Sequence, residues 1–372
     1  MTRIRSLRLT DFRSYAKLDW SITGRISVLT GSNGAGKTNL LEAISLLAPG
    51  RGLRGARLNE LARSGPGCSG GFAISAHVIE NSISALGFDL STIYGLKDRE
   101  RRLFSCDGAP ISAREADAHF CSVWLTPQMD RLFTEGANMR RRFLDRLTLT
   151  LDPNHAREVA AFEAASTNRN RLIERGDFDP LWSSMIEDAM ARHAVALTAS
   201  RLHLIDRLNA VFADWDEEAF PPSHLQLDCQ IAKKLHSVPA LSVEDWLRAS
   251  YADSRDKSII PVSPQRADLR IEDAQTGLAA SLASTGQQRA MLVALVLAHA
   301  SLISAWHGRA PILLLDEPFI HLDQERRLAL TAHLRAARNQ VFCAVTEIDS
   351  QMPFGDDATY GCITAQNVKI LG

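Results

Sequence analysis

Apolar residues follow a strand pattern at the start of the chain and a helix pattern soon after it. Residues 4–9 alternate between apolar and polar side chains, which predicts a half-exposed strand, and the apolar run 26–30 predicts a second strand. Leucine and isoleucine then recur on one helical face over 37–47, so we expect a helix there. Short alternating runs over 72–104 and the apolar segment 123–125 predict further strands. The first third of the chain is therefore expected to be mixed α/β structure.

The spacing of apolar residues becomes helical from about residue 138 to residue 214. Proline-containing steps at 152–153, 179–180 and 221–222 punctuate this part, which excludes one long uninterrupted coiled coil. Helices and strands then alternate again, with a helix over 287–304, a strand over 312–315, a helix near 324–339 and a strand over 341–345. We therefore predict an α/β head built from both ends of the chain, 1–135 and 256–372, with a helical lobe, 136–255, inserted between them.

The overall composition is that of an ordinary globular protein. With 372 residues, of which 45% are hydrophobic and 23% charged, the chain can form two or three lobes with sizeable cores. Its net charge of -1 neither supports nor excludes nucleic acid binding, because positive charge can gather on one face. The six cysteines show neither CxxC nor zinc-ligand spacing. We find no signal peptide and no apolar run near the roughly 18 residues of a membrane span, so we expect a cytoplasmic protein.

A glycine-rich loop joins the strand 26–30 to the helix that follows it. The loop matches the pattern GxxxxGK(S/T) in the strand-to-helix context that a phosphate-binding P-loop requires. Its backbone N–H groups and the helix N-terminus would cradle phosphate oxygens. Lys37 would contact the β- and γ-phosphates, and Thr38 would supply a hydroxyl to Mg²⁺. The residues expected to bind ATP here are Gly31, Ser32, Asn33, Gly34, Ala35, Gly36, Lys37, Thr38 and Asn39.

Two adjacent carboxylates follow the apolar strand 312–315. A strand of this composition is buried on both faces, and acidic side chains at its end are costly unless they have partners or a function. Asp316 is expected to hold Mg²⁺ through water. Glu317 is expected to orient or deprotonate the water that attacks the γ-phosphate, so Glu317 and Lys37 are the expected catalytic residues.

Three further segments favour an ABC-type P-loop ATPase over a kinase or a GTPase. Residues 284–288, STGQQ, open a long apolar helix and offer N–H and hydroxyl donors to an anion. In ABC ATPases the element at this separation from the acidic strand reaches the γ-phosphate held by a partner subunit, a role expected here of Ser284, Gly286 and Gln287. Asp323 follows Glu317 as in a D-loop. Gln128 ends the strand 123–125 where a Q-loop, with a further ligand for Mg²⁺, would lie.

The expected site is therefore only half complete in one copy of the chain. A monomer should hydrolyse ATP slowly, because charge in the transition state stays unstabilised on one side. ATP would then hold two copies together, and loss of the γ-phosphate would release them. No NKxD motif supports guanine specificity, and no switch histidine follows Val345, where Thr346 and Glu347 stand instead.

Several segments resemble the RecF family of DNA repair and replication proteins. The opening 9–15, LTDFRSY, is similar to the family's LxxFRNY, and 34–44 is similar to its P-loop. The resemblance continues at 50–54 (GRSxR), 126–128 (the Q-loop), 140–145 (RRRFLD), 168–172 (QRN), 263–269 (GPHRDDL) and 284–289 (the signature). The chain departs from the family's pattern at Gln265, Ala267, Glu317-Pro318 and Ile320-His321.

The resemblance implies a protein that binds gapped or single-stranded/double-stranded DNA as an ATP-dependent homodimer with weak, DNA-stimulated ATPase activity. It also implies work with RecR and RecO to help load RecA, and no membrane association. Arginines are the residues expected to meet DNA phosphates, although solvated charge, or a pair between Arg141 or Arg142 and Asp145, is the simpler interpretation. The candidates are Arg3, Arg5, Arg8, Arg140, Arg141 and Arg142.

Three other functions share part of this pattern. The ATPase subunit of an ABC transporter shares the P-loop and the acidic pair, but it does not account for the FRSY opening or the proline-interrupted insert. An SMC-like tether needs hundreds of heptad residues, which the insert lacks. A free-standing small-molecule kinase would need no second copy of the chain.

Overall fold

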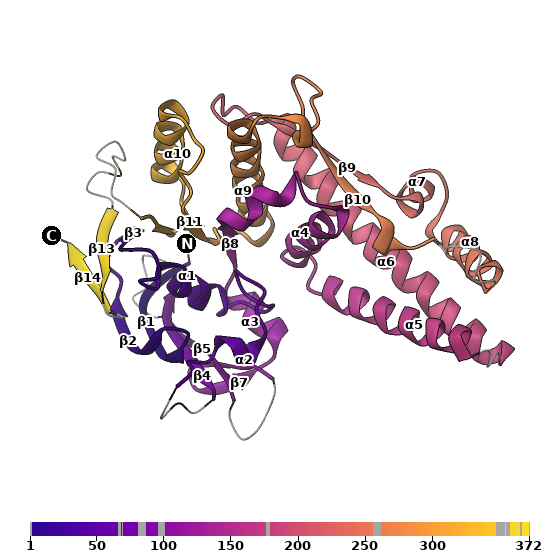
Figure 1. The fold of residues 1–372 in the computed structure, drawn as a ribbon, viewed down its shortest axis with the longest axis horizontal. Coiled ribbons are helices and arrows are strands. Elements are labelled where there is room, and N and C mark those ends of the chain that lie inside the picture. The colour runs from indigo at the N-terminus through magenta and orange to yellow at the C-terminus, as the bar shows by residue number, and fades with distance from the viewer. Residues whose placement is uncertain are drawn as a thin grey trace. The chain divides into compact units, whose positions relative to one another are not determined.

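The computed structural model describes residues 2–65, 68, 70–80, 87–95, 101–175, 179–255, 262–346, 354, 358–364 and 367–371. The chain forms two compact units (Figure 1). The head comprises Met1–Asp130, Glu218–Phe220 and Thr285–Gly372, and the lobe comprises Arg131–Glu217 and Pro221–Ser284. An α/β head with an inserted helical lobe is thus confirmed.

The lobe extends further along the chain than the sequence pattern predicts. Strand β10 (Asp268–Asp273) pairs antiparallel with β9 (Ser223–Asp228) along its whole length. Because its backbone hydrogen bonds go to β9, the segment up to Ser284 belongs to the lobe and not to the head. The boundary expected after residue 255 therefore lies after Ser284, and the first boundary lies after Asp130 instead of residue 135.

A six-stranded, mostly parallel sheet forms the centre of the head, with the strand order β14-β13-β3-β12-β11-β8. β13 runs parallel to β3, and only its pairing with the edge strand β14 is antiparallel. Every residue of β3, β11 and β12 is buried, as expected of parallel strands covered on both faces. The bounds are β3 (Ile26–Thr30), β8 (Ser122–Leu125), β11 (Ile312–Asp316), β12 (Val341–Ala344), β13 (Ala358–Thr364) and β14 (Asn367–Leu371).

A second, antiparallel sheet of six strands has the order β2-β1-β4-β5-β6-β7. Side chains alternate between buried and partly or fully exposed along β1, and between buried and half-buried along most of β4, so one face of the sheet packs on the core. The bounds are β1 (Arg3–Phe12), β2 (Tyr15–Ser21), β4 (Phe72–Ile79), β5 (Phe88–Tyr94), β6 (Leu103–Cys106) and β7 (Ala109–Ile111).

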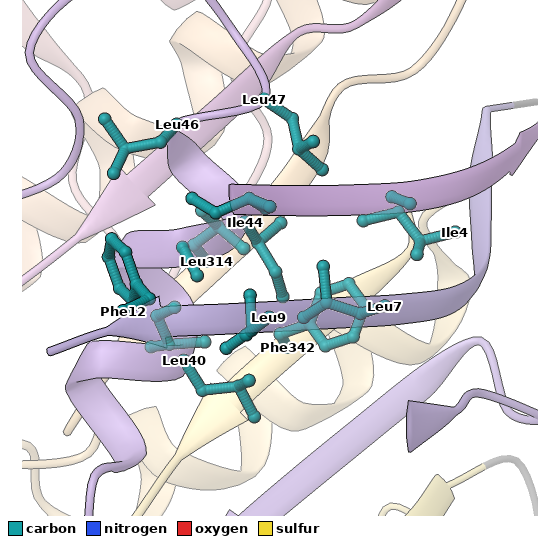
Figure 2. Close-up of a cluster of buried hydrophobic side chains, with 14 of the residues drawn as sticks. Ile4, Leu7, Leu9, Phe12, Leu40, Ile44, Leu46, Leu47, Leu314 and Phe342 are labelled. Carbon is teal, nitrogen blue, oxygen red and sulfur yellow. The ribbon is translucent and has the colours of Figure 1, made fainter. Parts of the chain in front are cut away.

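Helix α1 (Lys37–Ser45) is buried between the two sheets. Its Leu40 and Ile44 share one apolar cluster with Leu9 of β1, Leu314 of β11 and Phe342 of β12 (Figure 2). The helix that follows the P-loop is therefore fixed by core packing on both sides. The remaining α-helices of the head are α2 (Leu58–Leu61), α3 (Ala113–His119), α9 (Thr285–His307) and α10 (Gln324–Ala336), and the 3₁₀-helix η2 (Pro127–Leu132) crosses into the lobe.

Helix α9 is the one helix among the described residues that is long and apolar enough to cross a membrane. Within its 23 residues, an 18-residue stretch has a mean hydropathy of 1.7, and 72% of that stretch is buried inside the protein. The expectation that no stretch reaches this length is therefore wrong for α9. Burial of the residues from Arg289 to Ala300 shows instead a core helix.

Long helices make up most of the lobe. The proline-containing steps separate α4 (Ala137–Leu149), α5 (His155–Arg175) and α6 (Pro180–Ala213), as the sequence predicts. At the second step, Asp179 caps α6 by accepting hydrogen bonds from the N–H groups of Leu181 and Trp182, with Pro180 at the first helical position. The other helices are α7 (Gln230–Leu235), α8 (Ala240–Asp253) and the 3₁₀-helices η3 (Pro264–Arg266) and η4 (Ala280–Leu282).

Candidate functional site

The predicted catalytic segments meet at one edge of the parallel sheet. Strands β3, β12, β11 and β8 are consecutive neighbours and run parallel. Their carboxyl ends lead into the P-loop, Thr346, the pair Asp316-Glu317 and Gln128, respectively. Ligands of open α/β sheets bind outside the carboxyl ends of such strands. The fold therefore brings together the segments that the sequence placed in one site.

Two P-loop glycines lie where no other residue fits. Gly36 has φ 111°, and a Cβ there would come within 2.8 Å of the Tyr15 hydroxyl oxygen. Gly31 has φ 145°, and a Cβ there would lie 2.9 Å from the carbonyl oxygen of Ile363. Ser32, Asn33 and Gly34 are exposed at the tip of the loop. The two ends of the loop are therefore closely packed, while its tip is accessible to a ligand.

Hydrogen bonds between charged and polar side chains fix the position of the helix that follows the P-loop. The buried Glu42 of α1 binds the guanidinium of Arg13 through two hydrogen bonds of 2.9 and 3.0 Å. Arg54 donates to the side-chain oxygen of Asn39 at 2.9 Å, and Asn39 in turn donates to the Ser14 hydroxyl at 3.0 Å. Asn39, expected to bind nucleotide, thus ties the start of α1 to the FRSY turn.

Lys37 and Thr38 face the groups expected of them. The ammonium of Lys37, which is only 6% exposed, donates to the carbonyl oxygen of Gly31 at 2.6 Å and so lies over the loop. The hydroxyl of Thr38 lies 3.0 and 3.1 Å from the two carboxylate oxygens of Asp316. The P-loop and the acidic strand are therefore in direct contact.

The environment of Asp316 suits a divalent cation. Burial raises the pKa of Asp316, and the charge of Glu317 raises it further, while the Thr38 hydrogen bond, Arg54 and Lys37 oppose the rise. The balance leaves a buried carboxylate short of positive charge. A hydroxyl and a carboxylate are the oxygen ligands that Mg²⁺ takes, so Thr38 and Asp316 fit this ion. Gln128 is exposed three residues beyond the neighbouring strand β8.

Glu317 is held in a strained conformation at the end of β11. Its φ of 47° is rare for a residue other than glycine. Its N–H donates to the carbonyl oxygen of Ala344 in β12 at 2.8 Å. Its carbonyl oxygen accepts a hydrogen bond of 2.8 Å from Arg289. These contacts fix the backbone from which the carboxylate projects.

Arg289 is a residue whose role the sequence did not reveal. It lies in α9, directly after the signature, and is 1% exposed. Besides the carbonyl oxygen of Glu317, it binds the carboxylate of Asp130 in η2 at 2.5 Å. One buried guanidinium therefore joins the signature helix, the Q-loop segment and the expected catalytic residue. Its role could not be recognised from the sequence because both partners are distant along the chain.

Thr346 stands where a switch histidine was sought. Its hydroxyl donates to the Glu317 carboxylate at 2.5 Å and lies 3.5 Å from the side-chain oxygen of Asn33. Thr346 therefore touches both the residue expected to orient water and the tip of the P-loop. Glu347, the other residue considered, lies outside the described residues.

The signature segment is accessible at the start of α9. Ser284 and Gln287 are exposed, and Gly286 is half-buried, so no protein interior covers them. A Cβ at Gly286 would lie 3.4 Å from the carbonyl oxygen of His321 in the D-loop. Asp323 caps α10 by accepting from the N–H of Arg326 at 2.9 Å. The signature and the D-loop are thus neighbours, and exposed side chains of both can meet another molecule.

The candidate DNA-binding arginines differ in how far they are engaged. In β1, Arg3 is half-buried, Arg5 is exposed, and the exposed Arg8 lies 3.4 Å from Asp19. In α4, Arg140 donates to both carboxylate oxygens of Asp268 at 2.7 and 2.8 Å.

Arg141 and Arg142 border one cavity in the lobe. Arg141 donates to the carbonyl oxygen of Ala267, and Arg142 is exposed. The simpler interpretation, in which one of them pairs with Asp145, is wrong. Both oxygens of that carboxylate bind Arg201 instead, at 2.7 and 3.0 Å.

The sequence and the fold of the chain are similar to those of known proteins. Residues 3–370 match the family model described as RecF/RecN/SMC N terminal domain. The chain is 40% identical over 375 residues to the DNA replication and repair protein RecF of Rhizobium etli (strain CIAT 652), covering 98% of each chain. It is also 40% identical to the RecF of Agrobacterium fabrum, covering 96% of this chain and 97% of the other.

A solved structure of similar fold is that of the recombination mediator protein RecF with a nucleotide, described as part of the RecFOR pathway. Its TM-score is 0.83 at 22% identity, covering 100% of this chain and 98% of the other. The match includes the inserted lobe as well as the head, because it extends over the whole chain.

Proposed function

The chain belongs to the RecF family, and from this premise we propose that it is an ATP-dependent DNA-binding protein of recombinational repair and replication restart. The single observation that carries the proposal is the shared edge of β3, β12, β11 and β8, where the P-loop, Thr346, Asp316-Glu317 and Gln128 converge. Sequence identity of 40% to a RecF protein over 98% of the chain disfavours the alternative, the ATPase subunit of an ABC transporter.

In this proposal ATP lies along the P-loop with its phosphates at the carboxyl edge of the sheet. Lys37 leaves the carbonyl oxygen of Gly31 and contacts the phosphates, for which its charge is suited. Thr38, Asp316 and Gln128 would hold Mg²⁺, which would supply charge stabilisation to the phosphates. Glu317 orients the attacking water and accepts its proton, while Thr346 and Arg289 keep Glu317 in place.

The missing half of the site comes from a second copy. Ser284, Gly286 and Gln287 would contact the γ-phosphate held by the partner, and Asp323 would lie close to the same interface. Exposure of the signature residues supports this role, because donors buried within their own protomer could not reach a neighbour. The ATPase is then a slow conformational switch: ATP joins two copies and hydrolysis parts them.

The remaining assignments follow from the family. We propose that the dimer binds single-stranded and gapped duplex DNA, acts with RecR and RecO, and helps RecA to load. The protein is expected in the cytoplasm. Arg3, Arg5 and Arg8 on the antiparallel sheet are proposed to contact the DNA backbone, and the low exposure of Arg3 makes Arg5 and Arg8 the stronger candidates.

Binding to gapped duplex DNA in the presence of ATP should weaken steeply as salt rises. If about five phosphates are neutralised, the slope of log affinity against log salt concentration should be near −4. Fluorescence anisotropy of a labelled gapped duplex measures this slope, and the same titration without ATP is the control. A flat salt response, or equal affinity with and without ATP, would count against ATP-dependent DNA binding by the dimer.

A further inference from the structure

A polar cavity of about 410 Å³ lies within the lobe. Helices α4, α5 and α6 and the 3₁₀-helix η3 line it, and it contains no residue of the head. Three arginines border it: Arg141 and Arg142 from α4 and Arg201 from α6. Its volume falls in the range of small-molecule sites, roughly 300–1,000 Å³.

The carboxylates nearest these arginines already have partners. Asp145 accepts two hydrogen bonds from Arg201, at 2.7 and 3.0 Å, and makes a third contact of 2.8 Å with the His155 ring. Both carboxylate oxygens of Asp268 accept hydrogen bonds from the guanidinium of Arg140. Arg201 is therefore neutralised inside the lobe, and the direct hydrogen bonds of Asp145 and Asp268 go to Arg201, His155 and Arg140, not to Arg141 or Arg142.

Among the described residues, neither Arg141 nor Arg142 forms an ion pair. Arg141 donates to a neutral group, the carbonyl oxygen of Ala267, at 2.8 Å, and no carboxylate in the described part of the chain contacts it. Burial lowers the pKa of its guanidinium, and repulsion from Arg201 lowers it further, while the charges of Asp268 and Asp145 oppose the fall. Arg142 is exposed and has no ion-pair partner among the described residues. The third acid of the region, Glu163, is exposed at the rim.

We propose that this cavity binds a phosphate group, with Arg141 and Arg142 as its ligands. A guanidinium presents a planar fork of N–H donors that matches the oxygens of a phosphate, and the pairing is stronger than that with a neutral carbonyl. Gln265, exposed in η3, adds an amide at the same cavity. The buried side chains of Phe162 and Leu197 line the cavity beside the arginines and provide an apolar surface for the organic part of the ligand.

The phosphate can be carried by nucleic acid or by a small phosphate ester, and the chemistry of recognition is the same. Phosphate contacts hold a backbone without reading its sequence, so the cavity would position a strand and not select a base sequence. The cavity lies entirely in the lobe, so this proposal goes beyond the ATPase assigned to the head. It can be tested independently of the ATPase.

The test compares two double variants with the same change of charge. Arg141→Gln/Arg142→Gln removes the proposed ligands, and Arg171→Gln/Arg175→Gln removes two exposed arginines from α5 that do not border the cavity. Both are made in full-length Lys37→Met protein, because this substitution prevents phosphate binding at the P-loop. These proteins are titrated with inorganic phosphate and with a mononucleotide. Both are also made in the otherwise unaltered protein for binding of single-stranded DNA with ATP.

We expect the cavity variant, and not the control, to bind inorganic phosphate and the mononucleotide at least about tenfold more weakly, since removing a charge-assisted hydrogen bond weakens binding by a factor of about ten or more. If its DNA affinity falls by a similar factor, the phosphate belongs to nucleic acid, and unchanged DNA affinity assigns the cavity to a small phosphate ester. Equal binding of all three probes by both double variants would overturn the proposal.

A folding defect can be separated from loss of a ligand site. Arg142→Gln alone leaves the hydrogen bond from Arg141 to Ala267 intact, so it should fold normally and still weaken phosphate binding. Thermal unfolding with phosphate against chloride at equal ionic strength gives a second readout, because a bound ligand stabilises the folded state. Phosphate should raise the unfolding temperature of the Lys37→Met protein and of the control, but not of the cavity variant. An equal rise in all three would contradict the assignment.

Discussion

Replacing Glu317 with Gln is expected to slow ATP hydrolysis by about 10²–10³-fold while ATP still binds. The amide keeps the shape of the side chain and its contact with Thr346, but it cannot accept a proton from water. Because hydrolysis is what parts the two copies, the ATP-bound dimer should also last longer. Phosphate release under steady-state conditions measures the rate, and size-exclusion chromatography after addition of ATP measures the life of the dimer.

Thr346→Val provides the matched comparison for Glu317. Valine has nearly the same shape as threonine but removes the hydroxyl that donates to Glu317 at 2.5 Å. A positioning residue should give a smaller loss, about 10–100-fold, since one hydrogen bond to a charged group is worth roughly 1.5–3 kcal/mol. The rate should fall with little change in KM for ATP. Wild-type hydrolysis by Glu317→Gln would show that another group activates the water.

Replacing Lys37 with Met is expected to abolish ATP-dependent dimerisation and to weaken ATP binding by about 10²-fold. The ammonium is almost fully buried over the P-loop, so its loss removes a desolvated charge from the phosphates, which typically costs about 2–5 kcal/mol. Equilibrium titration with a fluorescent ATP analogue measures the affinity, and sedimentation velocity measures the dimer.

Lys17→Met is the control for this substitution. Lys17 is exposed in β2, so the same change of side chain there should leave ATP binding and dimerisation unaltered. Thermal unfolding without nucleotide should be similar for both variants. Normal ATP-dependent dimerisation of the Lys37→Met protein would refute the assignment of the phosphate site.

Local patterns predicted most of the head, because its strands and P-loop are encoded in short stretches of sequence. The loop from Gly31 to Thr38 needs a strand before it and a helix after it, and both lie where apolar spacing put them. The fully apolar strand before Asp316 likewise indicated a buried parallel strand. Short-range patterns of this kind depend on residues that are neighbours in sequence, so they can be interpreted without knowledge of the fold.

Contacts between distant segments were beyond the reach of such patterns. Nothing local shows that β10 pairs with β9 some 40 residues away, so the lobe was ended too early. Arg289 could not be linked to Asp130 and Glu317, because the three residues are far apart in sequence and meet only in the folded protein. The same applies to Asp145, whose helical spacing suggested Arg141 or Arg142 but whose partner, Arg201, comes from another helix.

The central claim is that each ATP is bound between the P-loop of one copy and the signature of the other. It is tested by combining Lys37→Met, which lacks a working P-loop, with Ser284→Arg, which places a large charge at the exposed signature. Sedimentation velocity with ATP and Mg²⁺ should show each variant alone as a monomer. An equal mixture should form dimers, because one of the two shared sites in each mixed pair then has an intact loop and an intact signature. Dimerisation of Ser284→Arg alone, as strong as that of the wild type, would contradict the account.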